Sequence, residues 1–303
     1  MTPLNEIPLE SYRLAQYTQN IECYVCDEPN LFDAELCRYC HAPMALAHQA
    51  NSQKLRPRMV GTIGPSCAGK TVYLGMLMDM LSREAGDMRL LARGAFSVTL
   101  QQSVVNSLAR CRFPDKTPNE PDQWNWVHGQ VMIPRQRRPV ELIMPDMAGE
   151  SLMEEVDHPH SYPVIHSFLK QCGGVQVLID ASRLEAGDRD ADYFAMKLLT
   201  YLCELEENEK HPWQKRPVAL VFSKADECQW CFDDPDAFAS KYTRSLWQYC
   251  RQRLRNYKFF ASGVAGTCGH RDVPGLGPQR IPLRLEPRGI VEPFEWMVRR
   301  LGR

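Results

Sequence analysis

The sequence predicts an α/β fold: a three-layer α/β/α domain with a mainly parallel sheet, preceded by a small cysteine-rich module. From residue 58 onward, short apolar runs alternate with helical patterns, which is typical of βαβ units. Several of these runs are continuously apolar, as expected of parallel strands that are buried on both faces. We therefore divide the chain into a tail (1–20), a cysteine-rich module (21–41), a linker (42–57) and the α/β domain (58–303).

The individual elements follow from apolar periodicity and from the placement of proline and glycine. We expect strands at residues 58–63, 126–133, 139–144, 174–179, 217–222 and 258–261. The second and third of these strands are too close in sequence for a helical crossover, so they should form an antiparallel hairpin. We expect helices at residues 70–85, 96–110, 162–171, 191–207, 235–255 and 291–301, and loops at residues 114–123 and 263–289.

Composition excludes several classes of protein. A chain of 303 residues with a formal net charge of −1 can bury a substantial core, and it is not a wholly basic nucleic-acid binder. Residues 241–303 carry 13 Lys and Arg against 4 Asp and Glu, which is consistent with a solvated face or with contact to an acidic surface or phosphates. We find no apolar run of membrane-span length and no secretory signal pattern, so we expect a cytoplasmic protein.

The segment 64–71, Gly-Pro-Ser-Cys-Ala-Gly-Lys-Thr, matches the phosphate-binding pattern G-x-x-x-x-G-K-[S/T]. It lies between a predicted strand and a predicted helix, as this pattern requires. Backbone N–H groups of such a loop bind phosphates, while the Lys70 ammonium bridges the outer phosphates and the Thr71 hydroxyl ligates Mg²⁺. The expected nucleotide contacts of this segment are Gly64, Ser66, Ala68, Gly69, Lys70, Thr71 and Val72.

The strand at 139–144 leads into Asp146 and Gly149, which form a D-x-x-G pattern. An aspartate at this place can hold Mg²⁺, usually through water. The Gly149 N–H can reach a γ-phosphate and release it after hydrolysis, which would make the segment a switch. The pattern is weak alone, but it gains weight because it ends a strand and follows a phosphate loop.

The strand at 217–222 leads into Ser223, Lys224 and Asp226, an S-K-x-D pattern similar to the N/T-K-x-D element that binds guanine. The Asp226 carboxylate can accept hydrogen bonds from N1–H and from the exocyclic amine of guanine, whereas adenine would leave it poorly paired. The aliphatic stem of Lys224 would cover the base. After the last predicted strand, Ser262 and Gly263 resemble the weak S-A-K element, in which a backbone N–H contacts the guanine oxygen.

Two C-x₂-C pairs indicate a metal site in the cysteine-rich module. Four thiolates at this spacing complete a tetrahedron, for which Zn²⁺ is the preferred ion, with an iron–sulfur centre as the alternative. A closed shell of four thiolates predicts a structural site that supplies folding energy to the module. The expected ligands are Cys23, Cys26, Cys37 and Cys40. A second metal site is an alternative at a third C-x₂-C pair and a later segment, with Cys228, Cys231, Cys268 and His270 as its ligands. The preferred interpretation is that these cysteines are unpaired structural residues.

Taken together, these motifs resemble those of P-loop GTPases of the translation-factor-related, Ras-like class, over residues 58–303. The zinc ribbon followed by a GTPase domain is similar to the bacterial double-GTPase family. This resemblance implies a GTP-binding switch with Mg²⁺ as cofactor. It also implies protein partners, such as a second GTPase or a GTPase-activating protein, in operons linked to biological conflict or signalling.

The sequence departs from the Ras-like pattern at Glu150, where those enzymes carry the glutamine that orients the attacking water. A carboxylate beside a γ-phosphate is repelled, so we expect slow intrinsic hydrolysis that a partner stimulates. We assign the catalytic roles to Lys70, Thr117 and Glu150. Thr117, in the 114–123 loop, is the expected switch threonine and third Mg²⁺ ligand, because Thr99 lies in a helical pattern.

Three other functions remain as alternatives. Glu150 leaves open a pseudo-GTPase scaffold that binds nucleotide with little or no turnover. An ATPase or small-molecule kinase is disfavoured by the S-K-x-D pattern. An RNA-associated GTPase is disfavoured by the near-neutral net charge.

Overall fold

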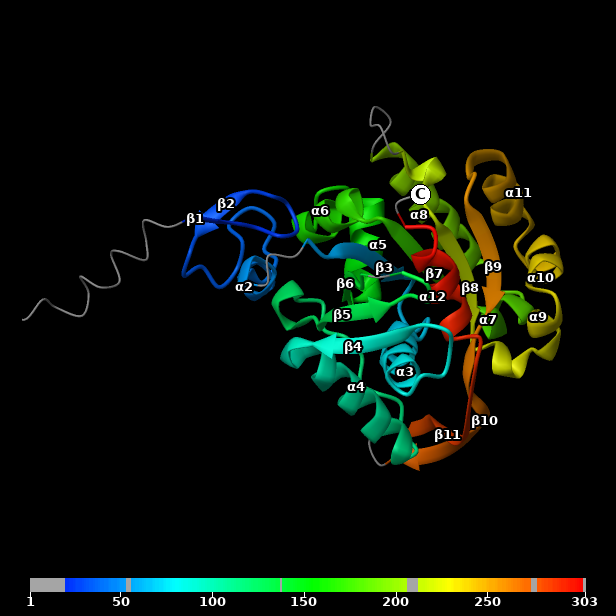
Figure 1. Ribbon diagram of the computed structural model, residues 1–303. Coiled ribbons are helices and arrows are strands. Elements are labelled where there is room, and N and C mark those ends of the chain that lie inside the picture. The colour runs from blue at the N-terminus through cyan, green and yellow to red at the C-terminus, as the bar shows by residue number, and fades with distance from the viewer. Residues whose placement is uncertain (1–19, 53–55, 137, 206–211, 274–276, 302–303) are drawn as a thin grey trace, which may run out of the picture.

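The computed structural model describes residues 20–52, 56–136, 138–205, 212–273 and 277–301 (Figure 1). Its centre is a seven-stranded sheet. The strands are β3 (Arg58–Ile63), β4 (Arg89–Arg93), β5 (Trp126–Met132), β6 (Val140–Pro145), β7 (Gly174–Asp180), β8 (Val218–Ser223) and β9 (Tyr257–Ala261). They lie in the order β4-β5-β6-β3-β7-β8-β9. β3 pairs in parallel with β6 and β7, and β7, β8 and β9 are also parallel, whereas β4, β5 and β6 pair antiparallel.

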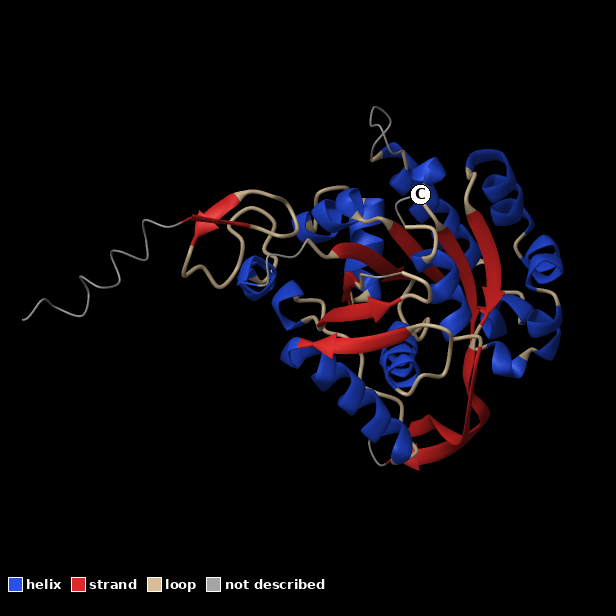
Figure 2. Ribbon diagram, viewed as in Figure 1, coloured by secondary structure: helices blue, strands red, loops and turns tan. Residues whose placement is uncertain are grey.

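Helices cover both faces of this sheet, which confirms the predicted three-layer architecture (Figure 2). One face packs against α3 (Lys70–Ser82), α4 (Gly94–Ala109) and α12 (Val291–Val298). The other face packs against α5 (Gly149–Asp157), α6 (Pro163–Gln171), α8 (Asp190–Glu204), α10 (Pro235–Tyr242) and α11 (Arg244–Arg253). The short elements are α7 (Ala181–Glu185), α9 (Gln229–Asp233), η1 (Pro121–Gln123), η2 (Trp213–Lys215) and η3 (Ala225–Glu227).

The central strands form because side chains of their apolar runs pack into two cores, one on each face of the sheet. All residues of β7 and β8 are buried. In β7, Val175 and Val177 pack into the core on the α6 and α8 side, whereas Leu178 packs into the core on the α3 side. This double burial explains why the largely apolar runs predict these strands well. The predicted hairpin of β5 and β6 is also confirmed.

The predicted helix at 235–255 is two helices, α10 and α11, separated at Thr243. This residue has φ −127° and ψ 50°, outside the helical region. Its side chain is fully buried, and its hydroxyl donates a hydrogen bond to the Ala239 carbonyl at 3.0 Å. The threonine thus satisfies a carbonyl at the end of α10 while the backbone turns, a local competition that apolar periodicity does not reveal.

The expected loop at 263–289 is wrong, because β10 (Gly263–Val273) and β11 (Gly277–Arg288) form a long antiparallel hairpin there (Figure 1). Irregular register near its base accommodates the glycines of β10. Within the described chain, each of the two strands pairs only with the other. One side of β11 is therefore open, and prolines are tolerated on an open edge.

The cysteine-rich module packs onto the α/β domain. It contains β1 (Asn20–Glu22) and β2 (Pro29–Leu31), and it continues into α2 (Met44–Ser52), which lies in the segment expected as a linker. Apolar residues of the module and of α2, including Val25, Met44, Leu46 and Ala47, share one core with β3 and with Phe168 of α6. The side-chain amide of Gln171 at the end of α6 also donates to the Asp27 carboxylate at 2.9 Å. No helix among the described residues is long and apolar enough to span a membrane.

Helix α5 is anchored by Glu155, a fully buried carboxylate. The carboxylate accepts hydrogen bonds from the Tyr201 hydroxyl and from the backbone N–H groups of His160 (3.0 Å) and Tyr162 (2.8 Å), and His166 Nδ1 lies 3.6 Å away. Burial raises the pKa of Glu155, but these hydrogen bonds outweigh burial and hold the pKa below its usual value. The ionised carboxylate therefore ties α5 to α6 and α8.

We expect Glu155→Ala to lower the free energy of unfolding by about 2–4 kcal/mol, because it leaves buried donors without an acceptor. The difference from the unchanged protein should be full at neutral pH and shrink as the pH falls through the lowered pKa of Glu155. Urea denaturation at several pH values measures both effects. The exposed neighbour gives the matched control, Glu154→Ala, and equal losses in the two variants would contradict the assignment.

Candidate nucleotide-binding site

The predicted phosphate loop joins the end of β3 to the start of α3. Gly64 has no room for a side chain, because a Cβ there would lie 2.5 Å from the Leu178 carbonyl oxygen. Gly69 has a left-handed backbone with φ 86°, which glycine adopts without strain. The loop thus curls back on itself and ends at the N-terminus of a helix, where backbone N–H groups favour an anion.

Lys70 begins α3 and is buried, with 6% of its surface exposed. Its ammonium donates hydrogen bonds to the carbonyls of Gly64 and Pro65, both at 3.0 Å. Burial lowers the pKa of Lys70 to about 8, and the charge of Asp146 opposes this effect. The ammonium therefore lies at the mouth of the loop, within reach of an anion bound there.

Three oxygen-bearing side chains converge beside Lys70. The Thr71 hydroxyl lies 3.0 Å from the Thr117 hydroxyl, and each hydroxyl donates to a different oxygen of the Asp146 carboxylate at 3.2 Å. Asp146 follows β6 and is 1% exposed, and its burial raises its pKa. Hydroxyl and carboxylate oxygens are the ligands that Mg²⁺ prefers, so this donor set fits that ion. Thr99, by contrast, is exposed on α4.

The loop that carries Thr117 is tied to the core by a tryptophan. The indole N–H of Trp124, which is 1% exposed, donates to the Pro118 carbonyl at 2.9 Å. The Ser151 hydroxyl, near the start of α5, donates to the Asn119 carbonyl at 3.0 Å. Two neighbouring points therefore fix the loop next to the D-x-x-G segment.

Gly149 lies directly against the phosphate loop. A Cβ at Gly149 would lie 2.4 Å from the Ser66 nitrogen and 2.6 Å from the Pro65 carbonyl carbon. Glu150, the next residue, forms an ion pair with Lys116. The hydrogen bond from Lys116 lowers the pKa of Glu150, and hydrogen bonds with Asn119 and Ser66 lower it further. Apolar periodicity gave no sign of helix α5, which starts at this glycine.

The S-K-x-D segment follows β8. Lys224 has a left-handed backbone with φ 55°, and its ammonium forms an ion pair with Asp180 at the end of β7, at 2.5 Å. Ser223 is 6% exposed, and its hydroxyl has no hydrogen-bond partner within the described ranges of the chain. A buried polar group without a partner in the protein is a candidate contact for a ligand.

Asp226 lies against the start of β10. A Cβ at Gly263 would lie 2.2 Å from Asp226 Oδ1, so the carboxylate sits on the glycine backbone. Burial raises the pKa of Asp226, while a hydrogen bond from the Val264 backbone partly opposes the effect. The Ala225 N–H donates to the Ser262 carbonyl at 3.0 Å. This hydrogen bond joins the S-K-x-D segment to the segment of Ser262 and Gly263.

All of these segments lie at the carboxyl ends of β3, β6, β8 and β9, which is where open α/β sheets bind ligands. The fold thus brings the four motifs to one edge of the sheet. Sequence reasoning missed Lys116, Asn119 and Asp180. Asp180 has a usable signal, since it ends a largely apolar strand, whereas the contacts of Lys116 and Asn119 join segments far apart in sequence.

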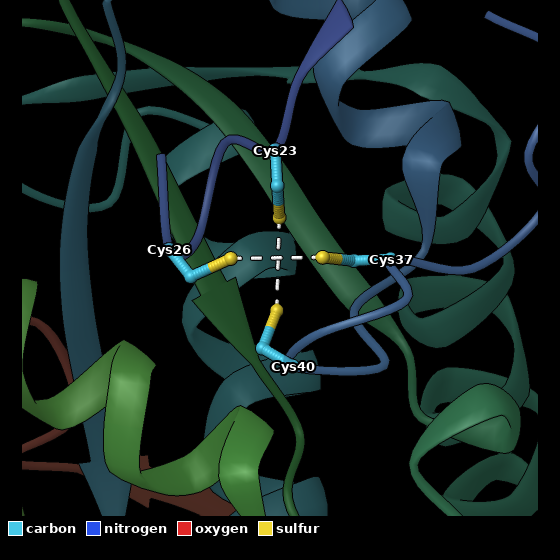
Figure 3. Close-up of side chains that lie close together, drawn as sticks. All are labelled: Cys23, Cys26, Cys37 and Cys40. Carbon is cyan, nitrogen blue, oxygen red and sulfur yellow. Dashed lines mark hydrogen bonds between the residues drawn. The ribbon is translucent and has the colours of Figure 1, made fainter. Parts of the chain in front are cut away.

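The four cysteines of the N-terminal module form a second candidate site (Figure 3). Their sulfur atoms point toward one another and lie within 4.8 Å of each other, with Cys23 to Cys40 and Cys26 to Cys37 both at 3.6 Å. A hydrogen bond from the Cys40 thiol lowers the pKa of Cys23 to about 6. This arrangement fits a tetrahedral thiolate site.

Backbone and amide N–H groups also point at these sulfurs. The Val25 N–H donates to Cys23 Sγ at 3.4 Å, and the Asn30 side chain donates to Cys37 Sγ at 3.3 Å. Such N–H···S contacts stabilise thiolate charge and orient metal ligands. Among the described residues, no other group of three or more potential ligands gathers in this way, so the alternative site at Cys228, Cys231, Cys268 and His270 is not formed.

A scan against protein-family models matches the chain to Double-GTPase 2 over residues 58–265, and no curated protein matches. Similar solved structures include the S. cerevisiae Ski7 GTPase-like domain bound to GDP and inorganic phosphate (16% identity, TM-score 0.39, 68% of this chain and 43% of that chain). The same domain bound to GTP also matches (14% identity, TM-score 0.40), again over 68% of this chain and 42% of that chain. A third is the signal recognition particle receptor SRb-GTP/SRX complex from Chaetomium thermophilum (13% identity, TM-score 0.36, 68% of this chain and 90% of that chain). The family model covers more than half of the protein, and the chain therefore belongs to the Double-GTPase 2 family.

Proposed function

We propose that the protein is a GTP-binding molecular switch that binds GTP and GDP with Mg²⁺ and hydrolyses GTP slowly. The observation that carries this proposal is the convergence of Thr71, Thr117 and Asp146 beside the buried ammonium of Lys70. Mg²⁺ bound to these oxygens would neutralise charge on the phosphates. Asp226, at the far end of the same site, would select guanine, and Ser262 and Gly263 would contact the base through the backbone.

Hydrolysis transfers the γ-phosphoryl group to water. The water oxygen forms a new bond to phosphorus, and the bond to the β–γ bridging oxygen breaks. GDP leaves with that electron pair, and inorganic phosphate and a proton are released. In this proposal Lys70 holds the β- and γ-phosphates, Thr117 senses the γ-phosphate, and Glu150 lies where the attacking water must be oriented. Loss of the γ-phosphate would release Thr117 and the Gly149 segment, which is the switch.

Intrinsic turnover should be slow, because a carboxylate replaces the water-orienting glutamine of Ras-like enzymes. We propose that a protein partner, such as a second GTPase or a GTPase-activating protein, raises the rate. The alternative is a pseudo-GTPase scaffold that binds nucleotide with little or no turnover. The feature that favours this alternative is Glu150, whose carboxylate pairs with Lys116 and replaces the water-orienting glutamine.

We further propose that the cysteine cluster holds one structural Zn²⁺. The converging sulfurs and the N–H groups that donate to them support a metal-bound thiolate site. Bound zinc would supply folding energy and no open coordination position. None of the twelve cysteines forms a disulfide, which fits a reducing compartment, and we place the protein in the cytoplasm.

Calorimetric titration of GTP, GDP and ATP into nucleotide-free protein, with and without Mg²⁺, tests the binding proposal. We expect binding of both guanine nucleotides, tighter with Mg²⁺, and little binding of ATP. Equal or tighter binding of ATP would overturn the guanine assignment. Phosphate release from bound GTP then separates the two functions, since a slow but measurable rate supports the GTPase and no release supports the pseudo-GTPase.

A further inference from the structure

One ion pair crosses the phosphate end of the candidate site. The ammonium of Lys116 donates to the carboxylate of Glu150, and both side chains are partly exposed, at 56% and 43%. The two residues are 34 positions apart, so the tertiary fold brings them together. Because both side chains are partly exposed, separating them leaves neither charge buried without a partner. The pair can therefore separate when a competing charge binds nearby.

The neighbours of each partner place the pair beside the γ-phosphate position. Lys116 directly precedes Thr117, whose hydroxyl contacts Thr71 and Asp146. Glu150 directly follows Gly149, which lies against the phosphate-loop backbone at Ser66. The loop around Lys116 has no helix or strand from residue 112 to residue 118, so its side chain can be redirected without breaking a regular element.

Electrostatics then predicts two arrangements of the Lys116–Glu150 ion pair. In the structure, the Glu150 carboxylate is the partner of Lys116. A γ-phosphate adds negative charge beside both groups, which repels the carboxylate and attracts the ammonium. Hydrogen bonds between two ionised groups are among the strongest in proteins, and phosphate oxygens are good acceptors for lysine.

We propose that Lys116 is a γ-phosphate-binding residue of this site, held in reserve by Glu150 until GTP binds. On GTP binding, Lys116 donates to a γ-phosphate oxygen, and the freed Glu150 carboxylate accepts a hydrogen bond from the attacking water. The chain thereby supplies, from its own switch loop, a positive charge of the kind that arginine fingers bring to other GTPases. This inference rests on the proposed function and deepens it by naming a further group, beside Thr117 and Gly149, that distinguishes GTP from GDP.

The primary test compares Lys116→Ala with Lys197→Ala. Lys197 pairs with Asp157 at 2.6 Å at the other end of α5, and its side chain is 60% exposed, so it is a matched exposed lysine far from the loop. Calorimetry with a non-hydrolysable GTP analogue and with GDP gives the ratio of the two affinities. We expect Lys116→Ala to lower the affinity for the analogue by about tenfold or more relative to the affinity for GDP. Lys197→Ala should leave the ratio of the two affinities unchanged.

A double-variant cycle separates phosphate binding from simple neutralisation of Glu150. If Lys116 binds the phosphate, Lys116→Ala should lower the analogue-to-GDP affinity ratio at least as much in a Glu150→Gln background as in the unchanged protein. If Lys116 only neutralises the carboxylate, Glu150→Gln should remove its effect, and that result would overturn the proposal.

Two readouts distinguish failure of this inference from failure of the proposed function. Absence of GDP binding by the unchanged protein would refute the nucleotide site itself. Normal GDP binding with an unaltered affinity ratio in Lys116→Ala would refute only the role of Lys116. Lys116→Arg, which keeps the charge, should retain most of the affinity for the analogue. If the affinity of this variant fell as low as that of Lys116→Ala, the result would also count against the proposal.

Discussion

Asp226→Ala should weaken GTP and GDP binding about a hundredfold or more, because two charge-assisted hydrogen bonds to guanine are lost together. The carboxylate is held in place by the Gly263 backbone and by a hydrogen bond from Val264. Binding of ATP should not change, since adenine offers no matching donors. Calorimetric titration of the three nucleotides measures the effect.

Asp226→Asn is the shape-matched control for this experiment. The amide keeps the volume of the carboxylate but places a donor opposite a guanine donor, so guanine affinity should again fall. A base with an oxygen in place of the exocyclic amine, as in xanthosine nucleotides, should bind this variant better than guanine does. Unchanged GTP affinity in both variants would show that Asp226 does not contact the base.

Removal of zinc should have the second large effect. The apparent binding free energy of structural zinc in small modules is about 10–16 kcal/mol, and that energy is folding energy for the ligand-bearing segment. We expect one zinc per chain, and we expect Cys37→Ser or a strong chelator to unfold the module. Because Val25 and Met44 share a core with α6, the thermal unfolding midpoint of the α/β domain should fall as well.

Metal analysis and calorimetric unfolding test this expectation together. Cys111→Ser changes an exposed thiol outside the cluster and should alter neither zinc content nor stability. A chain that carries no zinc as purified and is indifferent to Cys37→Ser would contradict the assignment. Bound iron in place of zinc, detected by its absorbance, would favour the alternative cluster.

The parts of the site that sequence reasoning located are those whose chemistry is local. The phosphate loop and the S-K-x-D segment each directly follow a buried, largely apolar strand, so strand and motif are found together. Placing Thr117 rather than Thr99 near Asp146 required only that one threonine lie in a loop and the other in a helix. The contact of Thr117 with Thr71 agrees with that placement.

The parts that sequence reasoning missed depend on partners distant in sequence. Helix α2 is rich in alanine and polar residues and is fixed by packing against the cysteine module, so its own sequence resembles a linker. The β10–β11 hairpin is rich in glycine and proline, and it exists because two irregular strands pair with each other. The pairing of Lys116 with Glu150 likewise depends on the fold bringing two loops together.

The close approach of Gly149 to the phosphate loop has an evolutionary consequence. The atoms that a side chain would strike are the Ser66 nitrogen and the Pro65 carbonyl carbon, which belong to the main chain. When an obstacle is a side chain, a second substitution nearby can make room for a larger residue. At Gly149 the obstacle is backbone, and every residue type at positions 65 and 66 has these same backbone atoms. No substitution at those two positions can therefore make room for a side chain at position 149. This position must stay glycine while the two loops keep their spacing.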